Sequence, residues 1–369
     1  MVKPIVIAAG GTGGHVFPAE ALAAALIARG HRVVLMTDAR SGALKSPVFA
    51  GHEQFVLPGA GIAGRGIWRG ARAVLALAAG TARARRLLKT LLPAAIVGFG
   101  GYPCVAPVVA AQSLRRRPFI LLHEQNAVLG RANRMLARLA DVLALGAVRT
   151  ARVPAGLETF AAGNPVRPAI AALSGQAYVP PGDTINLLVL GGSLGARIFS
   201  DVVPAALAGL PDSLRHRIAL VQQCRVEDIA RVRSACRAAG VEPTLAPFFT
   251  DMPDRLRAAH LVVARAGAST CAELAVCGRP SILVPLPGAI DDHQTANAGA
   301  LAEAGAAEII AQSTLTPALL AARLRDFLES PDRLASAAAS AAEAGKPRAA
   351  DTLADFVLTR SGLEKVLTA

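Results

Sequence analysis

The sequence contains a cluster of glycines beside a histidine, a combination that can carry chemistry. Gly10, Gly11, Gly13 and Gly14 occupy four of five successive positions, and His15 follows them directly. Because glycine loses more backbone entropy on folding than any other residue, such a cluster indicates that something must approach the main chain closely. Imidazole titrates near neutral pH and can take up a proton during a reaction. The stretch therefore predicts a ligand site floored by main-chain amides, with a proton acceptor at its edge.

Two further glycine-rich loops follow apolar runs, at residues 98–103 and 191–196. A strand–glycine–helix turn presents N–H groups at the positive end of a helix dipole, which favours an anion. The first loop is not G-x-G-x-x-G, since Val16 stands where the last glycine belongs, and no loop carries the Gly-Lys-Ser/Thr of a Walker motif. Each loop alone is also explained by a tight turn between strand and helix. Three of them together favour a ligand that bears phosphate.

Acidic and hydroxyl side chains gather in the second half of the chain. Thr270 and Glu273 have the spacing of a helix capping box, and Glu273 is equally suited to accept the two hydroxyls of a ribose; both interpretations stay open. Asp291, Asp292 and His293 are of metal-ligating types, but consecutive residues rarely converge on one ion. No Asp-x-Asp pair occurs elsewhere. The sequence therefore favours a site without a metal, in which amides and arginines neutralise the charge.

Short apolar runs alternate with Ala- and Leu-rich helical patterns, and these elements must position the loops. Such an alternation indicates parallel sheets covered on both faces. The expected strands are residues 4–9, 32–37, 94–99, 118–123 and 141–145 in the first half, and 185–190, 217–222, 261–266, 280–285 and 307–311 in the second. The pattern predicts helices for the rest of the chain beyond the last of these runs.

A strand, a glycine turn and a helix occur in the same order at residues 5–15 and 187–197. This weak repeat predicts an α/β fold of two doubly wound, Rossmann-like parallel-sheet domains facing a cleft, with ligand loops beyond the carboxyl ends of the strands. A boundary is expected near the Gly-, Asn- and Pro-containing stretch that begins at Phe160. We expect domains at residues 1–162 and 163–345, and a final helix at 346–369 that packs back towards the first domain.

The chain of 369 residues is long enough for two domains, and 53% of it is apolar. No apolar run approaches the roughly 18 residues that span a bilayer, and the first residues lack the pattern of a signal peptide. The cysteines form no CxxC pair, so we expect reduced, buried thiols in the cytoplasm. They are Cys104, Cys224, Cys236, Cys271 and Cys277.

The net charge of +13 is concentrated in one half of the chain. Residues 1–160 hold 20 of the 39 basic and 6 of the 26 acidic residues, so they carry +14 and the remainder carries −1. This asymmetry suggests that the first half faces a polyanion or an anionic membrane. Within residues 64–90, arginines at helical spacing with Trp68 among them are typical of a membrane-surface helix, and an ordinary helix with a solvated basic face is the alternative. The basic positions are Arg65, Arg69, Arg72, Arg83 and Arg86, with Arg115, Arg116 and Arg117 beyond them.

Seven motifs in chain order resemble those of one family. They are GGTGGHVFPA, GGYP, HEQNAVLGRAN, GNPVR, GGSLGAR, RAGAST followed by CAE, and DDHQTANA, and they run from Gly10 to Ala298. Together they resemble the undecaprenyl-diphospho-muramoylpentapeptide β-N-acetylglucosaminyltransferases of glycosyltransferase family 28, which act in bacterial cell-wall synthesis. The resemblance implies the two-domain fold called GT-B, with an acceptor- and membrane-facing first domain and a UDP-sugar-binding second domain.

The same resemblance implies an activity and its partners. N-acetylglucosamine would pass from UDP-N-acetylglucosamine to the 4-hydroxyl of the muramoyl sugar on a membrane lipid diphosphate, with inversion of the anomeric carbon. It implies no cofactor. The protein is expected to lie peripherally on the cytoplasmic face of the plasma membrane, bound to its anionic surface.

The resemblance also assigns residues to the substrates. Glu273 would hold the ribose, and the main chain at Phe249 would read uracil, so the identity of that side chain matters little. For the donor sugar the residues are Thr12, Gly13, Gly14, Asn126 and Gln294. For the diphosphate they are Arg167, Ser193 and Gly195. For the nucleoside they are Phe249, Ala268, Ser269, Thr270, Cys271, Ala272 and Glu273.

One stretch departs from the family pattern. Residues 222–225 read Gln-Gln-Cys-Arg where the family commonly has His-Gln-Ser/Thr-Gly, which leaves the role of this loop open but not the reaction. An inverting transfer is a single in-line displacement that needs a general base and an anion-stabilising site. His15 is the expected base, Glu124 is its rival, and a structural histidine hydrogen-bonded to the loop is the alternative. On the leaving side, amides at 193–195 and Arg167 would offset the developing charge.

Two other functions stay open. A UDP-N-acetylglucosamine 2-epimerase shares the two-domain plan but needs neither a lipid acceptor nor a basic membrane face. A non-catalytic nucleotide-sugar- or polyanion-binding protein belongs to a different class. Nucleic acid is disfavoured as a partner, because aromatic residues for base stacking make up only 4% of the chain.

Overall fold

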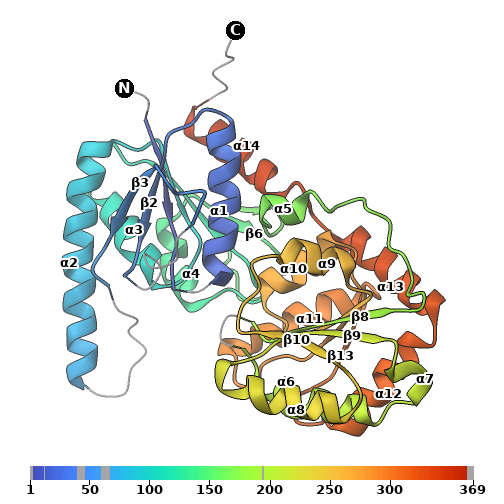
Figure 1. Cartoon of the computed structure of the whole chain (residues 1–369). Coiled ribbons are helices and arrows are strands. Elements are labelled where there is room, and N and C mark those ends of the chain that lie inside the picture. Colours follow the sequence, from blue (N-terminus) through green and yellow to red (C-terminus); the bar gives the residue numbers. More distant parts are fainter. Residues whose placement is uncertain (1–2, 12, 40–45, 60–66, 193–194, 364–369) are drawn as a thin grey trace. The chain divides into compact units, whose positions relative to one another are not determined.

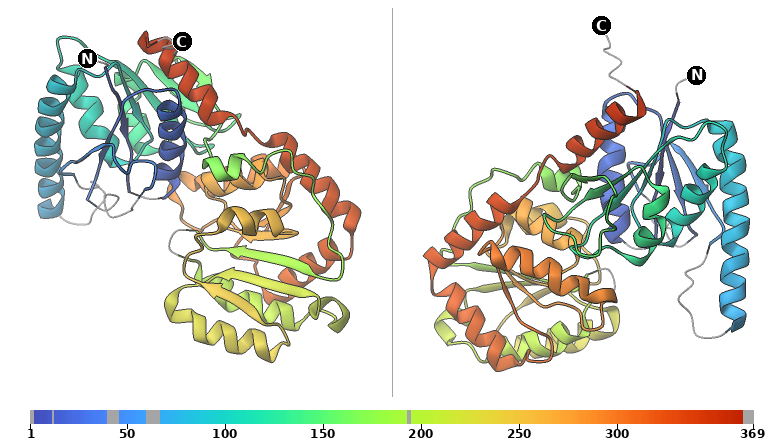
Figure 2. Two further views of the ribbon diagram at one scale, coloured as in Figure 1. Left: turned by 45° about the horizontal axis from the view of Figure 1, so that its top comes forward. Right: turned by 180° about the vertical axis from the view of Figure 1, so that it is seen from behind.

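The computed structural model describes the chain except residues 1–2, 12, 40–45, 60–66, 193–194 and 364–369, and except the side chains of 67–72. It contains two compact units (Figure 1). Unit 1 comprises Met1–Pro168 and Arg348–Ala369, and unit 2 comprises Ala169–Pro347. Each unit is a parallel sheet with helices on both faces, as Figure 2 shows from two further sides. The predicted fold class, α/β with two doubly wound Rossmann-like sheets, is confirmed.

The sheet of unit 1 has the strand order β3-β2-β1-β4-β5-β6-β7, and its neighbouring strands are parallel. Successive side chains of a strand point to opposite faces. Ile5 and Ile7 therefore join one apolar cluster, whereas Val6 and Ala8 join another on the opposite face. The strands are β1 (Ile5–Ala8), β2 (Val33–Thr37), β3 (Glu53–Val56), β4 (Ala95–Gly98), β5 (Phe119–Glu124), β6 (Val142–Leu145) and β7 (Thr159–Ala161).

Helices cover both faces of this sheet (Figure 2). The two that contribute to the cluster of Ile5 and Ile7 are α1 and α14, and α2 and α3 contribute to the cluster on the other face. The helices are α1 (Gly13–Ala28), α2 (Ile67–Leu91), α3 (Val105–Gln112), α4 (Arg131–Leu136) and α14 (Ala349–Ser361), with 3-10 turns η1 (Tyr102–Cys104) and η2 (Ala137–Leu139).

The last described helix, α14, belongs to the core of unit 1 and packs against α1. Phe356 stacks on Phe160 with ring centroids 4.1 Å apart. Arg29, which directly follows α1, forms an ion pair with Asp351 at 2.9 Å on the surface. The buried side chains recur at the three- and four-residue spacing of an amphipathic helix. They are Leu353, Ala354, Val357 and Leu358.

Unit 2 has a sheet of strand order β10-β9-β8-β11-β12-β13, again parallel throughout. Thr316 caps α12 with its Oγ1, which accepts from the Leu319 N–H at 3.1 Å, and Pro317 occupies the first helical position. The strands are β8 (Ile185–Leu190), β9 (Ile218–Gln223), β10 (Pro243–Ala246), β11 (Leu261–Ala264), β12 (Ser281–Leu283) and β13 (Ala307–Ile309). The helices are α5 (Pro168–Ala171), α6 (Arg197–Ala208), α7 (Asp212–Arg215), α8 (Ile229–Ala238), α9 (Met252–Ala258), α10 (Ala268–Val276), α11 (His293–Glu303), α12 (Pro317–Leu328) and α13 (Pro331–Ala344), with 3-10 turns η3 (Val226–Asp228) and η4 (Ile290–Asp292).

Three strands, β3, β7 and β10, are absent from the sequence prediction. All three lie at sheet edges, span three or four residues and are partly exposed. An edge strand does not need the continuous apolar sequence that marks a buried one. The prediction of buried thiols is confirmed, since all five cysteines are buried and free. Among the described helices, none is both long enough and apolar enough to cross a bilayer.

The substitution Leu353→Ala is expected to destabilise unit 1 selectively. Leu353 is fully buried in α14, so its truncation leaves a cavity that costs about 2–5 kcal/mol. Amide hydrogen exchange should accelerate in peptides from α1 and β1, while β8 and β11 of unit 2 keep their rates. The control is Thr352→Ala, an exposed neighbour on the same helix, which should change neither unit. Wild-type exchange in α1 of the Leu353→Ala protein would contradict this packing.

Candidate active site

The first glycine loop of unit 1 connects β1 to α1. Gly11 has a φ of +87°, which residues with a Cβ rarely adopt, and its N–H donates to Asp38 Oδ1 at 3.3 Å. A Cβ on Gly13 would lie 3.0 Å from the ring of Phe17, in the next turn of α1. Gly14 is exposed, and Thr12 lies outside the described residues. The N-terminus of α1 is therefore formed largely by main-chain atoms.

Asp38 ties the first loop to the second. Asp38 is the residue that follows β2, and it is 2% exposed. Its carboxylate accepts hydrogen bonds from the Gly11 N–H and the Tyr102 hydroxyl. Tyr102 belongs to the GGYP loop, in which Gly100 and Gly101 have φ values of +84° and +71°. Because a buried charge is tolerated only when it is paired and hydrogen-bonded, this carboxylate fixes the two loops relative to each other.

His15 stands in the first turn of α1, and its ring lies against the second loop. A Cβ on Gly100 would meet the ring carbon Cε1 at 3.4 Å, and one on Gly101 would meet Cδ2 at 3.5 Å. The ring nitrogen Nδ1 lies 3.1 Å from Gln125 Oε1. Since β1, β4 and β5 are neighbours in the sheet, they bring His15, the GGYP loop and the HEQN motif together at one edge.

Glu124, the second candidate base, is 2% exposed, and both its oxygens accept hydrogen bonds. Oε1 accepts from the main-chain N–H and the side-chain amide of Asn126, at 3.1 and 3.0 Å. Oε2 accepts from the Gly130 N–H at 2.8 Å and from Asn133 Nδ2 at 2.9 Å. A carboxylate has about four lone-pair positions, so four donors use its accepting capacity. Glu124 thus organises the turn that follows β5.

Arg167 of the GNPVR motif lies in unit 1, against α1. Its guanidinium carbon is 4.7 Å from the centroid of the Phe17 ring, a distance typical of a cation–π contact. Burial raises the pKa of Glu20 on the same helix, and the positive charge of Arg167 opposes that shift. The guanidinium of Arg167 is therefore held against α1, the helix that begins at the first glycine loop.

The third glycine loop connects β8 to α6 in unit 2. Gly192 and Gly195 have φ values of +80° and +70°, and the Gly195 N–H donates to the Gly192 carbonyl at 3.0 Å. Ala196 stands at the N-cap of α6 and has no side-chain acceptor for the amides of the first turn. Ser193 lies outside the described residues. The start of α6 therefore has no capping side chain at the position where an anion would bind.

Gln223, the last residue of β9, holds this loop from its neighbouring strand. Its Oε1 accepts from the Gly191 N–H at 3.2 Å, and its Nε2 donates to the Pro247 carbonyl after β10 at 3.1 Å. The side chain is 7% exposed. One buried amide thus links the loops that follow β8, β9 and β10, which a buried amide does stably when both its ends are paired.

Arg225, which departs from the family pattern, packs directly on the third loop. A Cβ on Gly195 would lie 2.7 Å from Arg225 Cγ, closer than real Cβ atoms approach. The guanidinium is held by Asp228, with 2.7 Å between Nε and Oδ2, and by Glu227 at 3.1 Å. The stem of Arg225 therefore occupies the space that a side chain at 195 would need.

The nucleoside motif lies at the start of α10, and the capping-box interpretation of Thr270 and Glu273 is wrong. A capping box needs Thr270 at the N-cap, whereas Gly267 takes that position and Thr270 lies within the helix. Cys271 faces the interior, and burial raises its pKa to about 12. The half-buried positions of this stretch are Ala268, Ser269, Thr270, Ala272 and Glu273.

The DDHQ stretch spreads its side chains rather than gathering them. Asp291 and Asp292 have left-handed φ values of +57° and +53°. Asp292 Oδ1 accepts from the Thr295 hydroxyl at 2.7 Å, while His293 donates from Nδ1 to the Ile290 carbonyl at 2.7 Å. In the part of the chain that the structure describes, no three His, Cys, Asp or Glu side chains form a group that could hold a metal ion.

Phe249 lies in the loop after β10, and Gln294 lies in the first turn of α11. Gln294 Oε1 accepts from the Leu286 N–H at 2.9 Å, which anchors the side chain to the loop after β12. Phe249 is 6% exposed, and the Arg255 guanidinium lies 4.3 Å from its ring centroid. The Phe249 side chain is therefore packed away, and a role of its main chain in reading a base stays a prediction.

Sequence reasoning missed two residues of these sites, Gln125 and Arg265. Arg265 is 8% exposed and donates from Nη1 to the Val284 and Pro285 carbonyls at 3.0 and 3.1 Å. Burial lowers its pKa. Arg265 belongs to the loop before α10, and these two hydrogen bonds tie that loop to the residues that follow β12. Both residues lie within quoted motifs, HEQN and RAGAST, and this membership is the one sequence signal that could have identified them.

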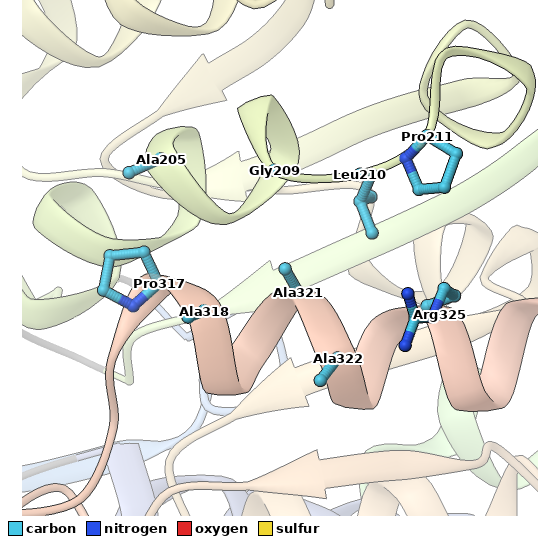
Figure 3. Close-up of a pocket in the computed structure, with 9 residues that line it drawn as sticks. All are labelled: Ala205, Gly209, Leu210, Pro211, Pro317, Ala318, Ala321, Ala322 and Arg325. Atoms are coloured by element: carbon cyan, nitrogen blue, oxygen red, sulfur yellow. The ribbon is translucent and has the colours of Figure 1, made fainter.

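A pocket of about 360 Å³ lies on unit 2 between α6 and α12 (Figure 3). It opens along the C-terminal half of α6, about 12 Å along the helix axis from Arg197 at 1.5 Å per residue. None of the predicted site residues lines it. Its lining residues are Ala205, Gly209, Leu210, Pro211, Pro317, Ala318, Ala321, Ala322 and Arg325.

Two Rossmann-like parallel sheets, each with glycine loops at the carboxyl ends of its strands, are the architecture of the GT-B fold, and the family matches that follow place the chain among the glycosyltransferases of this fold. Residues 5–145 match the glycosyltransferase family 28 N-terminal domain, and residues 186–353 match the glycosyltransferase family 28 C-terminal domain. These matches cover most of the chain, which belongs to glycosyltransferase family 28. The family relationship predicted from the seven motifs is confirmed.

Individual relatives agree with this family. The chain is 61% identical over 357 residues to the UDP-N-acetylglucosamine--N-acetylmuramyl-(pentapeptide) pyrophosphoryl-undecaprenol N-acetylglucosamine transferase of Granulibacter bethesdensis, covering 96% of this chain and 93% of that protein. It matches the crystal structure of Acinetobacter baumannii MurG with a TM-score of 0.76 and 32% identity, covering 97% of this chain and 100% of that one. A putative UDP-N-acetylglucosamine 2-epimerase from Listeria monocytogenes has a TM-score of 0.67 at 16% identity, with 99% and 98% coverage, and shares the fold alone.

The contact between Arg225 and Gly195 can be tested with two alanine substitutions in one loop. Gly192→Ala places a Cβ in open space at a left-handed φ, so it should cost about 1–2 kcal/mol. Gly195→Ala adds the overlap with Arg225, which should cost about 1–3 kcal/mol more. Urea unfolding of unit 2 measures both.

Adding Arg225→Ala removes the overlap, so in the Arg225→Ala background Gly195→Ala should cost no more stability than Gly192→Ala does. It should not rescue Gly192→Ala, which is the matched control for strain alone. Equal rescue of both variants would show that Arg225 does not constrain residue 195.

Proposed function

We infer that this protein transfers N-acetylglucosamine from UDP-N-acetylglucosamine to the 4-hydroxyl of undecaprenyl-diphospho-N-acetylmuramoyl-pentapeptide, with inversion at the anomeric carbon. The observation that carries this conclusion is the 61% identity, along nearly the full chain, to a relative named for this reaction. The 2-epimerase alternative is supported by the fold alone, at 16% identity. A non-catalytic binding protein would have no need of an imidazole held against two bare glycines.

Unit 2 is proposed to bind UDP. The N-cap positions of α6 and α10 are Ala196 and Gly267, which cannot cap with a side chain, so first-turn amides are available to an anion. The diphosphate would lie at the loop that contains Ser193 and Gly195. With the capping box excluded, the carboxylate of Glu273 is proposed to accept the ribose hydroxyls. The half-buried face of α10 around Glu273 would hold the nucleoside, and the main chain at Phe249 would read uracil.

Unit 1 is proposed to bind the lipid diphosphate acceptor and to supply the base. Of the two candidates, His15 is favoured, because four donors already occupy both oxygens of Glu124. In the transfer, the 4-oxygen bonds to C1 of the sugar while the bond from C1 to the phosphate oxygen breaks. The hydroxyl proton passes to His15, and UDP leaves with the bonding electron pair.

The remaining unit 1 residues are proposed to position the donor sugar and the leaving group. Thr12, Gly13 and Gly14 at the start of α1, together with Asn126, would contact the sugar, as Gln294 of unit 2 would from its anchored position. Arg167 would offset negative charge on the diphosphate, with its guanidinium already fixed over Phe17. The charge would thus be neutralised by amides and arginine, without a metal.

Unit 1 is also proposed to rest on the anionic cytoplasmic face of the plasma membrane. Its helix α2 buries a stripe of small and apolar residues that includes Ala73, Ala84 and Leu88. Away from that stripe, Leu75 is 69% and Val74 56% exposed. Among the described side chains of this helix, the exposed cations are Arg83, Arg85, Arg86 and Lys89. Of the predicted basic positions, Arg65 and the side chains of Arg69 and Arg72 lie outside the described residues. Exposed aliphatic side chains beside clustered cations suit the surface of an anionic bilayer.

Acceptor-dependent release of UDP tests the proposed reaction. The wild-type protein should release UDP from UDP-N-acetylglucosamine only when the muramoyl lipid diphosphate is present. His15→Ala should lower kcat by about 10²–10⁴, the usual contribution of a general base. His52→Ala, a histidine of unit 1 outside the site, is the control and should keep wild-type turnover. Release without acceptor, or epimerised sugar, would refute the transferase.

Charge reversal on α2 tests the membrane proposal. The double variant Arg86→Glu/Lys89→Glu should bind vesicles of phosphatidylglycerol and phosphatidylcholine more weakly than wild type, and salt should weaken wild-type binding. The matched control is Arg237→Glu/Arg257→Glu, which makes the same charge change at exposed positions of unit 2. Sedimentation with the vesicles measures both. Equal partitioning of the wild type onto neutral and anionic vesicles would end the proposal.

A further inference from the structure

A chain of hydrogen bonds runs from His15 into the interior of unit 1. His15 Nδ1 lies 3.1 Å from Gln125 Oε1, and Gln125 Nε2 lies 3.1 Å from His123 Nδ1. His123 Nε2 in turn lies 2.9 Å from the main-chain oxygen of Gly163. Gln125 is 4% exposed and His123 is fully buried. Because buried polar atoms must find partners within the protein, the hydrogen positions along this chain depend on one another.

The Gly163 carbonyl sets the inner end of the chain. A carbonyl oxygen has no hydrogen to give, so His123 Nε2 must carry the proton of this bond. Burial lowers the pKa of His123 to about 4, against the opposing charge of Glu124, so the ring is neutral at neutral pH. A neutral imidazole has a single N–H. His123 Nδ1 is therefore a hydrogen-bond acceptor.

The orientation of the Gln125 amide follows from its surroundings. Its Nε2 lies 3.1 Å from the Phe99 carbonyl and 3.2 Å from the His123 carbonyl, in addition to the bond to His123 Nδ1. An oxygen in that place would face three acceptors and no donor, which is costly in a buried site. The NH2 group must therefore point inward, and Oε1 must face His15.

We propose that Gln125 is a positioning residue that holds His15 in the tautomer with the proton on Nδ1, which leaves Nε2 unprotonated. Oε1 of Gln125 accepts hydrogen bonds only, so His15 Nδ1 is the donor of the bond that joins them. His15 Nε2 then faces the GGYP loop, where a Cβ on Gly101 would lie 3.6 Å from it. The inference rests on the proposed role of His15 as the base, since Nε2 is then the atom that takes the acceptor proton.

This arrangement matters because a neutral histidine side chain in water prefers the opposite tautomer, with its proton on Nε2. In that form Nε2 already carries a hydrogen and has no free lone pair with which to accept the hydroxyl proton. The Gln125 amide reverses the preference without adding a charge, whereas the aspartate of a serine-protease triad both orients its histidine and stabilises the imidazolium. After proton transfer, the Nδ1–H bond to Gln125 is retained. The proton enters at Nε2 and no other bond of the chain changes.

Nitrogen-15 NMR of the imidazoles in the wild-type protein without substrates tests the inference directly. At a pH where both rings are neutral, His15 should show a protonated Nδ1 and a bare Nε2, and His123 should show the reverse. The signals of His15 among the seven histidines are assigned by their loss in His15→Asn. A wild-type His15 with its proton on Nε2 overturns the inference, whatever the activity of the protein.

The substitution Gln125→Met tests the consequence for turnover. Methionine has a similar length but accepts no strong hydrogen bond, so His15 should shift towards the Nε2–H tautomer. The kcat should fall about tenfold, a part of what a general base supplies, while KM for UDP-N-acetylglucosamine changes by less than about twofold. The control is Gln54→Met, which replaces a glutamine of unit 1 bonded to the Phe49 carbonyl.

The possible results separate the two proposals. A Gln125→Met protein with the wild-type tautomer overturns the inference. If wild-type His15 carries its proton on Nδ1 but the wild-type protein shows no acceptor-dependent UDP release, the proposed function is refuted and the tautomer assignment stands. If Gln125→Met does not fold, the wild-type spectra of His15 and His123 decide.

Discussion

Left-handed glycines at the carboxyl ends of the strands are the constraint on which both sites depend. Each of the three glycine loops passes through a φ between +70° and +87°, at Gly11, at Gly100 and Gly101, and at Gly192 and Gly195. Any residue with a Cβ is strained in that conformation, so these positions exclude side chains for a reason of backbone geometry alone. In these three loops the bare main chain that a phosphate-bearing substrate requires therefore follows from the backbone geometry of the turn.

Buried polar side chains then hold these turns rigid. Asp38, Glu124 and Gln223 are each at most 7% exposed, and each is hydrogen-bonded to main-chain N–H groups of a loop. An unpaired buried polar group costs more free energy than a paired one contributes, so each of these side chains strongly disfavours other loop conformations. Pre-organised donors of this kind need not reorganise as charge develops on a leaving group. In unit 1 the same physics extends to the tautomer of His15.

The sequence predicted those features that depend on local pattern and missed those that depend on distant partners. The ten expected strands are all present. Nine of them lie inside a sheet, where a parallel strand must be apolar on both faces, whereas the edge strands β3, β7 and β10 carry no such mark. The interpretation of Thr270 as a cap failed because Gly267, which has no capping side chain, begins the helix. The local sequence marks Gln125 only as a member of the HEQN motif. Its role depends on His15, which is 110 residues away in the chain and adjacent only once β1, β4 and β5 are paired.

The departure at residues 222–225 is compatible with the family fold because its consequences are contained locally. An arginine at 225 needs volume beside the third glycine loop, and Gly195 provides it by lacking a Cβ. It also introduces a positive charge, which Asp228 and Glu227 neutralise through direct ion pairs. Gln223 keeps the bonds that join three loops. With the cation paired, the change in this loop alters the packing beside the main-chain amides at the start of α6, where the diphosphate is proposed to bind.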